Sequence, residues 1–299
     1  MTKSNHLFSI IIPTRNRLKD LDSCLQAVAR LDYPADCFEV IVVDDGSSES
    51  PACVINSFRQ QMQVSLVCQT HAGPAAARNT GAKRANGEFL AFTDDDCMPQ
   101  RDWLQKLAAQ FTRTPDHLVG GRTVNALEKN GYSTASQIIV DIVYSYYNAD
   151  PANARFFAAN NLAAPAGQFH EIGGFDTSFR TSEDRELCDR WRHGRLGMTY
   201  TPEAIVFHAH ALTAGSFLGQ HFGYGRGAFR FHQMRARRGS GRLVQDLAFY
   251  KRFPILMGRK LSELRGGRAL QIAGLLIAWQ AANTAGFFWE MKQASQSRG

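Results

Sequence analysis

The chain has 299 residues, of which 44% are hydrophobic and 20% charged, and its formal net charge is +7. This length accommodates one large α/β domain or a domain with an appended segment, and the composition excludes a wholly disordered chain. The six cysteines form no CxxC pair, so we expect reduced thiols rather than a disulfide framework or a structural zinc site.

The first hundred residues alternate between two kinds of pattern. Runs rich in β-branched and aromatic residues predict strands at 7–12, 38–44, 64–69 and 88–94. Helical patterns lie between them at 17–31, 50–62 and 73–87. Strands that alternate with helices predict an α/β fold with a mixed, mostly parallel sheet flanked by helices.

A polar cluster follows each of these four strands. The clusters are PTRN at 13–16, DDGS at 44–47, THAGPAAARN at 70–79 and DDD at 94–96. Ligands of such sheets bind beyond the carboxyl ends of the strands. We therefore expect the four clusters to share one rim of the sheet.

The remaining chain is less regular. Residues 115–180 show no clear pattern, whereas 102–112 and 182–194 predict helices and 204–208 predicts a strand. Beyond residue 215 the composition shifts to arginine, glycine and aromatic residues, and the stretch 269–289 has no charge. We expect 215–299 to form a basic, helical C-terminal extension.

The three consecutive aspartates need a compensating cation, because like charges this close raise one another's pKa or recruit a metal. Oxygen ligands favour hard ions such as Mg²⁺ or Mn²⁺. In extended backbone Asp94 and Asp96 point to one side and Asp95 to the other. The alternative is a solvated turn whose acids cap the next helix.

Five segments in order along residues 7–210 resemble family 2 glycosyltransferases of the GT-A fold. They are IIPTRNR at 11–17, VVDDGS at 42–47, GPAAARNTGAKRANGEFLAFTDDD at 73–96, GGFD at 173–176 and ED at 183–184. The resemblance implies a Rossmann-like GT-A domain and an inverting transferase that uses a nucleoside-diphosphate sugar. It also implies a role in the synthesis of cell-surface or extracellular glycans or glycolipids.

The resemblance assigns the donor side to residues after the first three strands. It implies that the nucleoside and diphosphate contact Pro13, Thr14, Arg15, Asp44, Asp45 and Arg78. Asp44 is the preferred acceptor of hydrogen bonds from the base, with Asp45 as the less certain candidate. Arg78 lies near the start of a helix, which suits ribose or phosphate oxygens. Residues 45–47 also suit a turn and helix start without ligand.

The same resemblance implies a divalent cofactor, Mn²⁺ or Mg²⁺. It places Asp94 against the ribose, with Asp95 among the donor-side residues, and gives Asp96 to the metal. His208 matches a further metal ligand, although a histidine at a strand end is often structural. His210 lies on the same side of an extended strand, so it is an alternative ligand.

On the acceptor side the resemblance makes Asp184 the general base and Glu183 its neighbour or an acceptor contact. Alternatively, both acids only satisfy a helix dipole. Gly173, Gly174, Phe175 and Asp176 are expected to form part of the acceptor wall. No carboxylate is identifiable as a covalent nucleophile, which favours a single displacement with inversion.

We divide the chain into a catalytic domain, 1–214, and the extension, 215–299. Within the former, 1–100 is the nucleotide-binding half and 101–214 the acceptor half. The expected partners are a sugar nucleotide, with UDP preferred, and a glycan or lipid-linked acceptor. The chain lacks the QxxRW motif of cellulose- and hyaluronan-type synthases, which argues against a processive polymerase.

The extension concentrates the positive charge. Between Arg226 and Arg268 there are 12 Lys and Arg residues and two acids. With 269–289, which could span a bilayer, lie on it or pack as a helix, this region (226–289) predicts contact with an anionic membrane surface. A solvated basic linker is the alternative. The N-terminal apolar run is too short for a signal peptide, so we expect a cytoplasmic protein, peripheral to the membrane.

Two other functional classes are compatible with parts of the sequence. A sugar nucleotidyltransferase shares the nucleotide and metal requirements but needs neither the ED helix nor the GGFD turn. A non-catalytic protein that binds nucleotide sugars or nucleic acid is the other class. Nucleic acid is disfavoured, because the arginine- and aromatic-rich extension contains no recognised nucleic-acid module.

Overall fold

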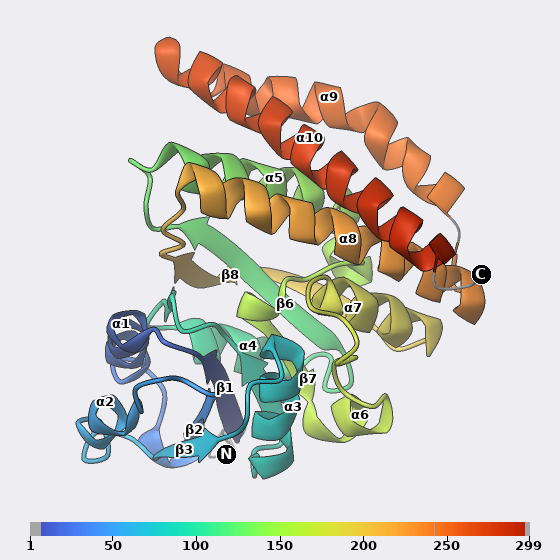
Figure 1. Cartoon of the computed structure of the whole chain (residues 1–299). Helices are drawn as coiled ribbons and strands as arrows, with labels where there is room; N and C mark the ends of the chain where they lie inside the picture. The colour runs from blue at the N-terminus through green and yellow to red at the C-terminus, as the bar shows by residue number, and fades with distance from the viewer. Residues whose placement is uncertain (1–6, 242, 297–299) are drawn as a thin grey trace.

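A computed structural model describes residues 7–241 and 243–296, so Arg242 of the basic region lies outside the described residues. Figure 1 shows a twisted sheet flanked by helices. Two long helices, α5 and α8, lie beside the β6–β8 part of the sheet, and α9 and α10 cover them on the outer side. The predicted α/β class is confirmed, and the extension is helical as expected.

The sheet has eight strands in the order β3-β2-β1-β4-β7-β6-β8-β5. The strands are β1 Phe8–Thr14, β2 Phe38–Asp44, β3 Val64–Cys68, β4 Phe89–Phe92, β5 Cys97–Pro99, β6 Leu118–Asn125, β7 Leu162–Pro165 and β8 Met198–His208. The first four are parallel, β7 is antiparallel to β4 and β6, and β6 is parallel to β8. Short β5 pairs with β8 so that Cys97 lies opposite His208, which brings the aspartate segment beside the end of β8.

The helices are α1 Leu18–Val28, α2 Ala52–Asn56, α3 Pro74–Arg84, α4 Trp103–Phe111, α5 Gly131–Tyr147, α6 Ala166–Glu171, α7 Glu183–His193, α8 Ala214–Arg238, α9 Leu247–Ser262 and α10 Gly267–Gln296. Short 3₁₀ turns occur at Ala35–Cys37, Pro151–Asn153, Ala159–Asn161 and Leu243–Asp246. The expectation of an irregular segment at 115–180 is wrong, because β6, α5, β7 and α6 lie there. Helix α5 is rich in β-branched and aromatic residues, which hides its helical pattern. Packing on two sides stabilises it.

Alternate residues of β1 supply the cores on the two faces of the sheet. Ile10 and Ile12 pack in one cluster with residues of α1 and α4, including Leu25 and Trp103. Ile11 belongs to the opposite cluster, with residues of α3, α6 and α7. Because successive side chains of a strand point to opposite faces of the sheet, a continuous apolar run predicts a strand that is buried on both faces.

A third cluster joins the C-terminal helices to the rest of the chain. It combines Ile142 of α5, Phe217 of α8, Phe249 of α9 and Ile272 of α10. Helices α8 and α10 also cross closely, since a Cβ at Gly225 would lie 1.9 Å from the carbonyl oxygen of Asn283. The uncharged stretch 269–289 is therefore part of a helix packed on α8. Within residues 7–241 and 243–296, no helix has the length and apolar character needed to cross a membrane.

Candidate active site

A cavity of about 570 Å³ lies beyond the carboxyl ends of β1 and β4. Of the predicted site residues, those that line it are Pro13, Thr14, Arg15, Asp45, Arg78, Asp94, Asp95, Asp96, Glu183, Asp184 and His208. Asp44 and the GGFD residues 173–176 are not among its lining residues. The rim expected from the strand ends therefore exists, and it extends to the start of α7.

The three aspartates do not alternate as expected. Strand β4 ends at Phe92, and the chain turns at Asp95 and Asp96. Asp95 accepts hydrogen bonds from Thr14 Oγ1 at 2.8 Å and Arg17 Nη1 at 3.1 Å, and Asp96 accepts from the same Arg17 nitrogen at 2.7 Å. The expectation that Asp95 faces away is thus wrong, because strand alternation does not apply within a turn. Burial raises the pKa of Asp95 to about 6, although Arg17 opposes the shift.

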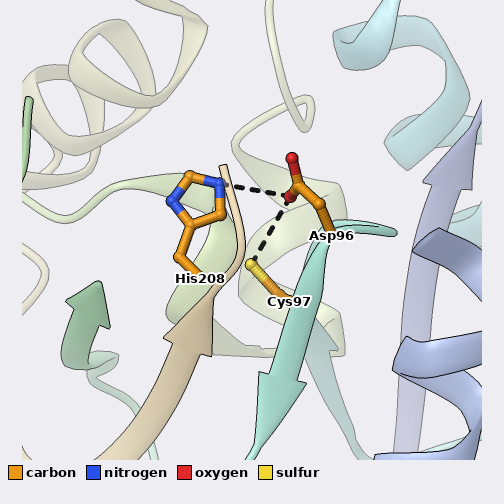
Figure 2. A group of neighbouring side chains, drawn as sticks. All are labelled: Asp96, Cys97 and His208. Carbon is orange, nitrogen blue, oxygen red and sulfur yellow. Dashed lines mark hydrogen bonds and ion pairs between the residues drawn. The ribbon is translucent and has the colours of Figure 1, made fainter. Parts of the chain in front are cut away.

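Asp96 and His208 form the best-defined pair of metal-ligating side chains. Figure 2 shows His208 Nε2 directed at Asp96 Oδ1, 3.1 Å away, with the Cys97 thiol directed at the same oxygen. Burial opposes ionisation of Asp96, but hydrogen bonding and attraction from His208 hold its pKa well below the usual range, and Arg17 adds to this. Burial opposes protonation of His208, but Asp96 raises its pKa.

This donor set fits a divalent cation. Ligand atoms of Asp96, Cys97 and His208 lie within 4.8 Å of one another. A carboxylate with an imidazole suits Mn²⁺, whereas Mg²⁺ prefers oxygen alone. Burial raises the pKa of the Cys97 thiol, so it stays protonated and is a poor ligand for a hard ion. His210 stacks on His208 with ring centres 4.8 Å apart and is not part of this group.

Asp44, the preferred candidate for the nucleotide base, does not line the cavity, whereas Asp45 does. Asp44 Oδ1 accepts a hydrogen bond from Ser47 N at 3.0 Å and so stabilises the turn after β2. Asp45 reaches the cavity and accepts from Ala72 N at 2.8 Å and Gly73 N at 2.9 Å, which fixes the loop before α3. Burial opposes ionisation of Asp45, but these hydrogen bonds lower its pKa.

Arg78 of α3 connects the two sides of the cavity. Its side chain is 5% exposed, and it donates to Asp94 Oδ1 at 2.6 Å and to Glu183 Oε1 at 2.8 Å. Burial opposes its charge, but the two carboxylates outweigh burial and raise its pKa. The guanidinium also lies over the ring of Phe175, 5.6 Å from its centre. Arg78 therefore holds the aspartate segment and the start of α7 in fixed relation.

Asp184 differs from its neighbour Glu183, whose carboxylate is held by Arg78. Asp184 accepts a hydrogen bond from Arg185 N at 2.7 Å, and no ion pair to it occurs within the described part of the chain. Burial and repulsion from Glu183 raise its pKa to about 7. The residue before the pair, Ser182, has φ of 69°, a conformation that is strained for serine. A carboxyl group that titrates near neutrality is suited to take up a proton.

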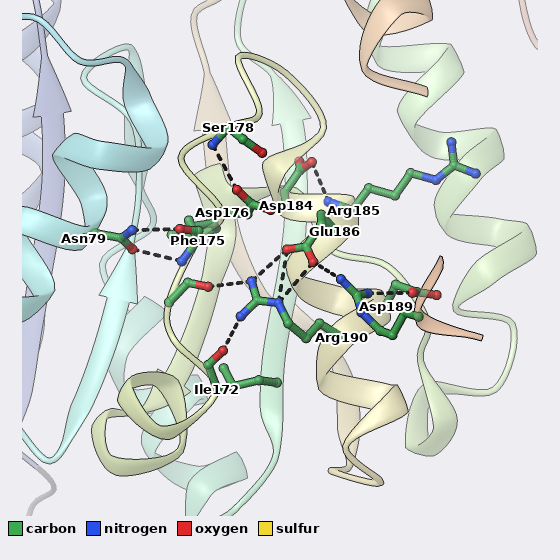
Figure 3. A network of polar contacts seen from close by, with 12 residues as sticks. Asn79, Ile172, Phe175, Asp176, Ser178, Asp184, Arg185, Glu186, Asp189 and Arg190 are labelled. Atoms are coloured by element: carbon green, nitrogen blue, oxygen red, sulfur yellow. Dashed lines mark hydrogen bonds and ion pairs between the residues drawn. The ribbon is translucent and has the colours of Figure 1, made fainter. Parts of the chain in front are cut away.

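The GGFD segment packs against Arg78 and does not line the cavity. Figure 3 shows the Asn79 amide bonded to both backbone groups of Phe175, at 2.8 and 2.9 Å. Arg190 of α7 donates to the carbonyl oxygens of Ile172 and Gly174. Phe175 is 2% exposed, and Asp176 accepts from Ser178 N within its own turn. The segment is thus a structural turn under Arg78, away from the cavity.

Several cavity residues are not predicted from the sequence, among them Arg17, Gln220 and Tyr224. Arg17 is the last residue of the IIPTRNR segment, and neither the residues nor the resemblance predict a function for it. It pairs with both Asp95 and Asp96. Gln220 and Tyr224 of α8 also line the cavity, and Gln220 Nε2 lies 2.6 Å from the Tyr224 hydroxyl. Their i, i+4 spacing indicates only one helix face, so nothing local in the sequence relates them to Asp184.

Comparison with known proteins agrees with this geometry. The model of the family described as glycosyl transferase family 2 matches residues 9–183. The chain belongs to this family. It is 29% identical over 231 residues to the glycosyltransferase AglE of Haloferax volcanii, covering 76% of this chain and 74% of that protein. A pre-mycofactocin glycosyltransferase of Mycobacterium tuberculosis is 27% identical over 228 residues, covering 74% of this chain but 46% of that protein. The chain is therefore a glycosyltransferase.

Solved structures share its fold at low identity. The mannosyltransferase PcManGT from Pyrobaculum calidifontis, in complex with GDP-Man and Mn²⁺, has a TM-score of 0.69 and 16% identity, covering 96% of this chain and 88% of that one. Staphylococcus aureus TarS 1–349 in complex with UDP-GlcNAc has a TM-score of 0.59 and 15% identity, covering 97% and 92%. The fold of the transferase is thus of the GT-A type.

Replacing Arg78 tests the connection between the two sides of the cavity. Arg78→Gln leaves Asp94 and Glu183 without their buried partner, so the free energy of unfolding should fall by about 3–5 kcal/mol in urea titrations. Lys83→Gln, on an exposed position of the same helix, should change it by less than about 0.5 kcal/mol. Equal stability of the two variants would contradict the role given to Arg78.

Proposed function

We propose that the transferase moves a sugar from a nucleoside-diphosphate donor to an acceptor hydroxyl by a single displacement with inversion, with a divalent cation. The observation that carries this is the state of Asp184. It lines the same cavity as the Asp96–His208 pair, and its pKa is about 7. Each of the other acids of the cavity has an arginine or histidine partner, whereas Asp184 has backbone N–H partners and no ion pair among the described residues.

In the proposed step the acceptor hydroxyl gives its proton to the carboxylate of Asp184. The acceptor oxygen forms a bond to the anomeric carbon as the bond from that carbon to the diphosphate oxygen breaks. The nucleoside diphosphate leaves with the bonding electrons. No covalent sugar–protein bond is needed, and Glu183, held by Arg78 at 2.8 Å, is not free to form one.

Asp96 and His208 are the proposed ligands of Mn²⁺ or Mg²⁺. A divalent cation there would offset charge on the diphosphate as it leaves. The Arg17 guanidinium donates a hydrogen bond to Asp96 Oδ2, whereas Asp96 Oδ1 faces His208 Nε2. Arg17 thereby keeps the carboxylate ionised and oriented.

The donor is proposed to lie along Pro13, Thr14, Arg15 and Asp45, all of which line the cavity. Arg15 is exposed and has Nη1 3.4 Å from His71 Nε2, so it can turn toward a phosphate. The fold neighbours bind different nucleotides: PcManGT is in complex with GDP-Man, and TarS with UDP or UDP-GlcNAc. UDP remains the nucleotide predicted from the sequence, and a donor screen should contain both UDP-sugars and GDP-sugars.

A donor screen tests the proposal directly. We expect at least one of a panel of UDP-, GDP- and dTDP-sugars to raise the melting temperature with Mn²⁺ and to be consumed with release of nucleoside diphosphate. Asp96→Asn should remove the Mn²⁺-dependent part of the shift, because it loses the ligand charge. Asp36→Asn, at an exposed position of the 3₁₀ turn Ala35–Cys37, is the control. If no donor binds to the unaltered protein, the proposal fails.

The pH dependence of transfer tests Asp184. Its raised pKa means that the group is protonated below about 7 and cannot accept a proton there, so kcat should fall about tenfold per pH unit on the acid side. Asp184→Asn should retain donor binding and lower kcat by about 10²–10⁴-fold. A kcat that is level from pH 5 to 8 in the unaltered protein would exclude this base.

We further propose that the outer surface of α9 and α10 contacts an anionic membrane. Arg226 and Arg230 pair with Glu290, which offsets part of the positive charge of the predicted basic region. The outer surface instead combines exposed apolar and basic side chains: Ile255, Leu270, Ile277 and Phe288 with Lys251, Arg252, Arg259 and Arg265. On α10 the apolar positions follow helical spacing, and Leu270 is 78% and Ile277 71% exposed. Figure 1 shows both helices outermost.

Vesicle flotation tests this surface. At low salt the protein should float with vesicles of phosphatidylglycerol and phosphatidylcholine and not with phosphatidylcholine alone. Lys251→Gln with Arg252→Gln should weaken binding by about 1 kcal/mol for each residue. Lys83→Gln with Arg84→Gln, exposed on α3, is the matched control. Flotation that is equal for both double variants would contradict the proposed surface.

A further inference from the structure

A second cavity, of about 590 Å³, adjoins the first one and is enclosed largely by α5, α8, α9 and α10. The two cavities share wall residues that include Asn160, Ser182, Gln220 and Tyr224. Ser182 precedes the ED pair, so the second cavity opens next to the proposed base. Its volume matches that of sites for small organic ligands.

The interior of this cavity is aromatic and includes buried polar atoms without a partner among the described residues, Gln220 Oε1 and His221 Nδ1. Its walls include Tyr147, Phe249 and Trp279. His221 is 3% exposed, and its Nε2 lies 3.3 Å from Ser136 Oγ, while Nδ1 has no partner within the described residues. Burial lowers the pKa of His221 to about 4, so the ring is neutral at pH 7. A buried, unpaired ring nitrogen on a cavity wall is suited to a hydrogen bond with a ligand hydroxyl.

Arginines gather in the wall of this cavity, and its two acids are already engaged. Asp189 pairs with Arg235 at 3.2 Å, and Asp246 pairs with Arg235 at 2.9 Å and Arg185 at 3.6 Å. Arg155 and Arg192 also line the cavity, and neither has a carboxylate partner within residues 7–241 and 243–296. Both are exposed residues, which places them at the opening.

The environment of these two arginines favours an anion. Arg155 lies over the ring of Tyr147, with its guanidinium carbon 4.9 Å from the ring centre, and this stacking leaves the N–H edge available. Burial, followed by repulsion from Arg155, lowers the pKa of Arg192. Arg155 and Arg192 line the same cavity without a carboxylate partner in the described part of the chain, and a guanidinium group can donate two hydrogen bonds to a phosphate or carboxylate.

We propose that this second cavity binds the acceptor, and that the acceptor carries a phosphate group held by Arg155 and Arg192. Its hydroxyl-bearing part lies against the shared wall beside Asp184, and an apolar or ring portion lies against Trp279 and Tyr147. This inference rests on the proposed transfer reaction for the identity of the ligand as acceptor. The phosphate can belong to a lipid or to a soluble phosphosugar, and both contain the chemistry that the arginines recognise.

Calorimetry on the full chain tests the site without any transfer. The probes are decyl phosphate below its micelle concentration, glucose 6-phosphate, and decyl glucoside as the uncharged comparison. Arg155→Gln with Arg192→Gln should weaken binding of the phosphate probe about tenfold or more and leave decyl glucoside unaffected. Arg155→Lys with Arg192→Lys should recover part of the affinity. Arg59→Gln with Arg113→Gln, exposed elsewhere, is the matched control.

The outcomes separate the alternatives. Tighter binding of decyl phosphate than of glucose 6-phosphate assigns a lipid phosphate, and the reverse order assigns a soluble phosphosugar. Binding that is equal in the Gln double variant and the control overturns the proposal, as does displacement by UDP or GDP with Mn²⁺, or no binding of either phosphate. Because donor binding is measured separately, a failed donor screen refutes the transfer reaction and leaves this test of the cavity intact.

Discussion

The site depends on one buried guanidinium. Arg78 lies between Asp94, which follows the parallel strands, and Glu183, which begins α7. A buried arginine is stable only while its carboxylate partners are in place, and each carboxylate needs the arginine for the same reason. The aspartate segment and the start of α7 are therefore stabilised together. Next to Glu183, burial and charge repulsion raise the pKa of Asp184 to about 7.

The fold of the first hundred residues was predictable because the sequence information that determines it is local. Apolar runs of β1 and β2 with helical patterns between them determine a parallel sheet, and the strand ends locate the rim. Helix α5 was not predictable in this way, because its helical face contacts partners that lie far away in the sequence. Helix α2 is shorter than its pattern suggested, since it ends at Asn56 in a series of turns.

The same distinction applies to the site. Asp96, His208 and Asp184 could be named from motifs, and the structure brings Asp96 and His208 within 3.1 Å. The predicted direction of the Asp95 side chain was wrong, because that direction is determined by a turn. Asp44 closes a different turn, and its neighbour Asp45 lines the cavity. Gln220 and Tyr224 could not be found at all. These two residues line the cavity because of the way α8 packs in the folded protein, and no short sequence motif predicts that packing.

Helix α8 approaches the loop before Asp184 so closely that a side chain at Gly227 would meet it. A Cβ there would lie 2.6 Å from Ser182 Oγ and 2.5 Å from Thr181 Oγ1. This contact limits how such enzymes can be recombined. A chimaera that takes its C-terminal helices from a relative is expected to keep this close contact only if residues 181–227 come from one parent. A crossover inside this block would separate Asp184 from the helix that packs against the loop before it.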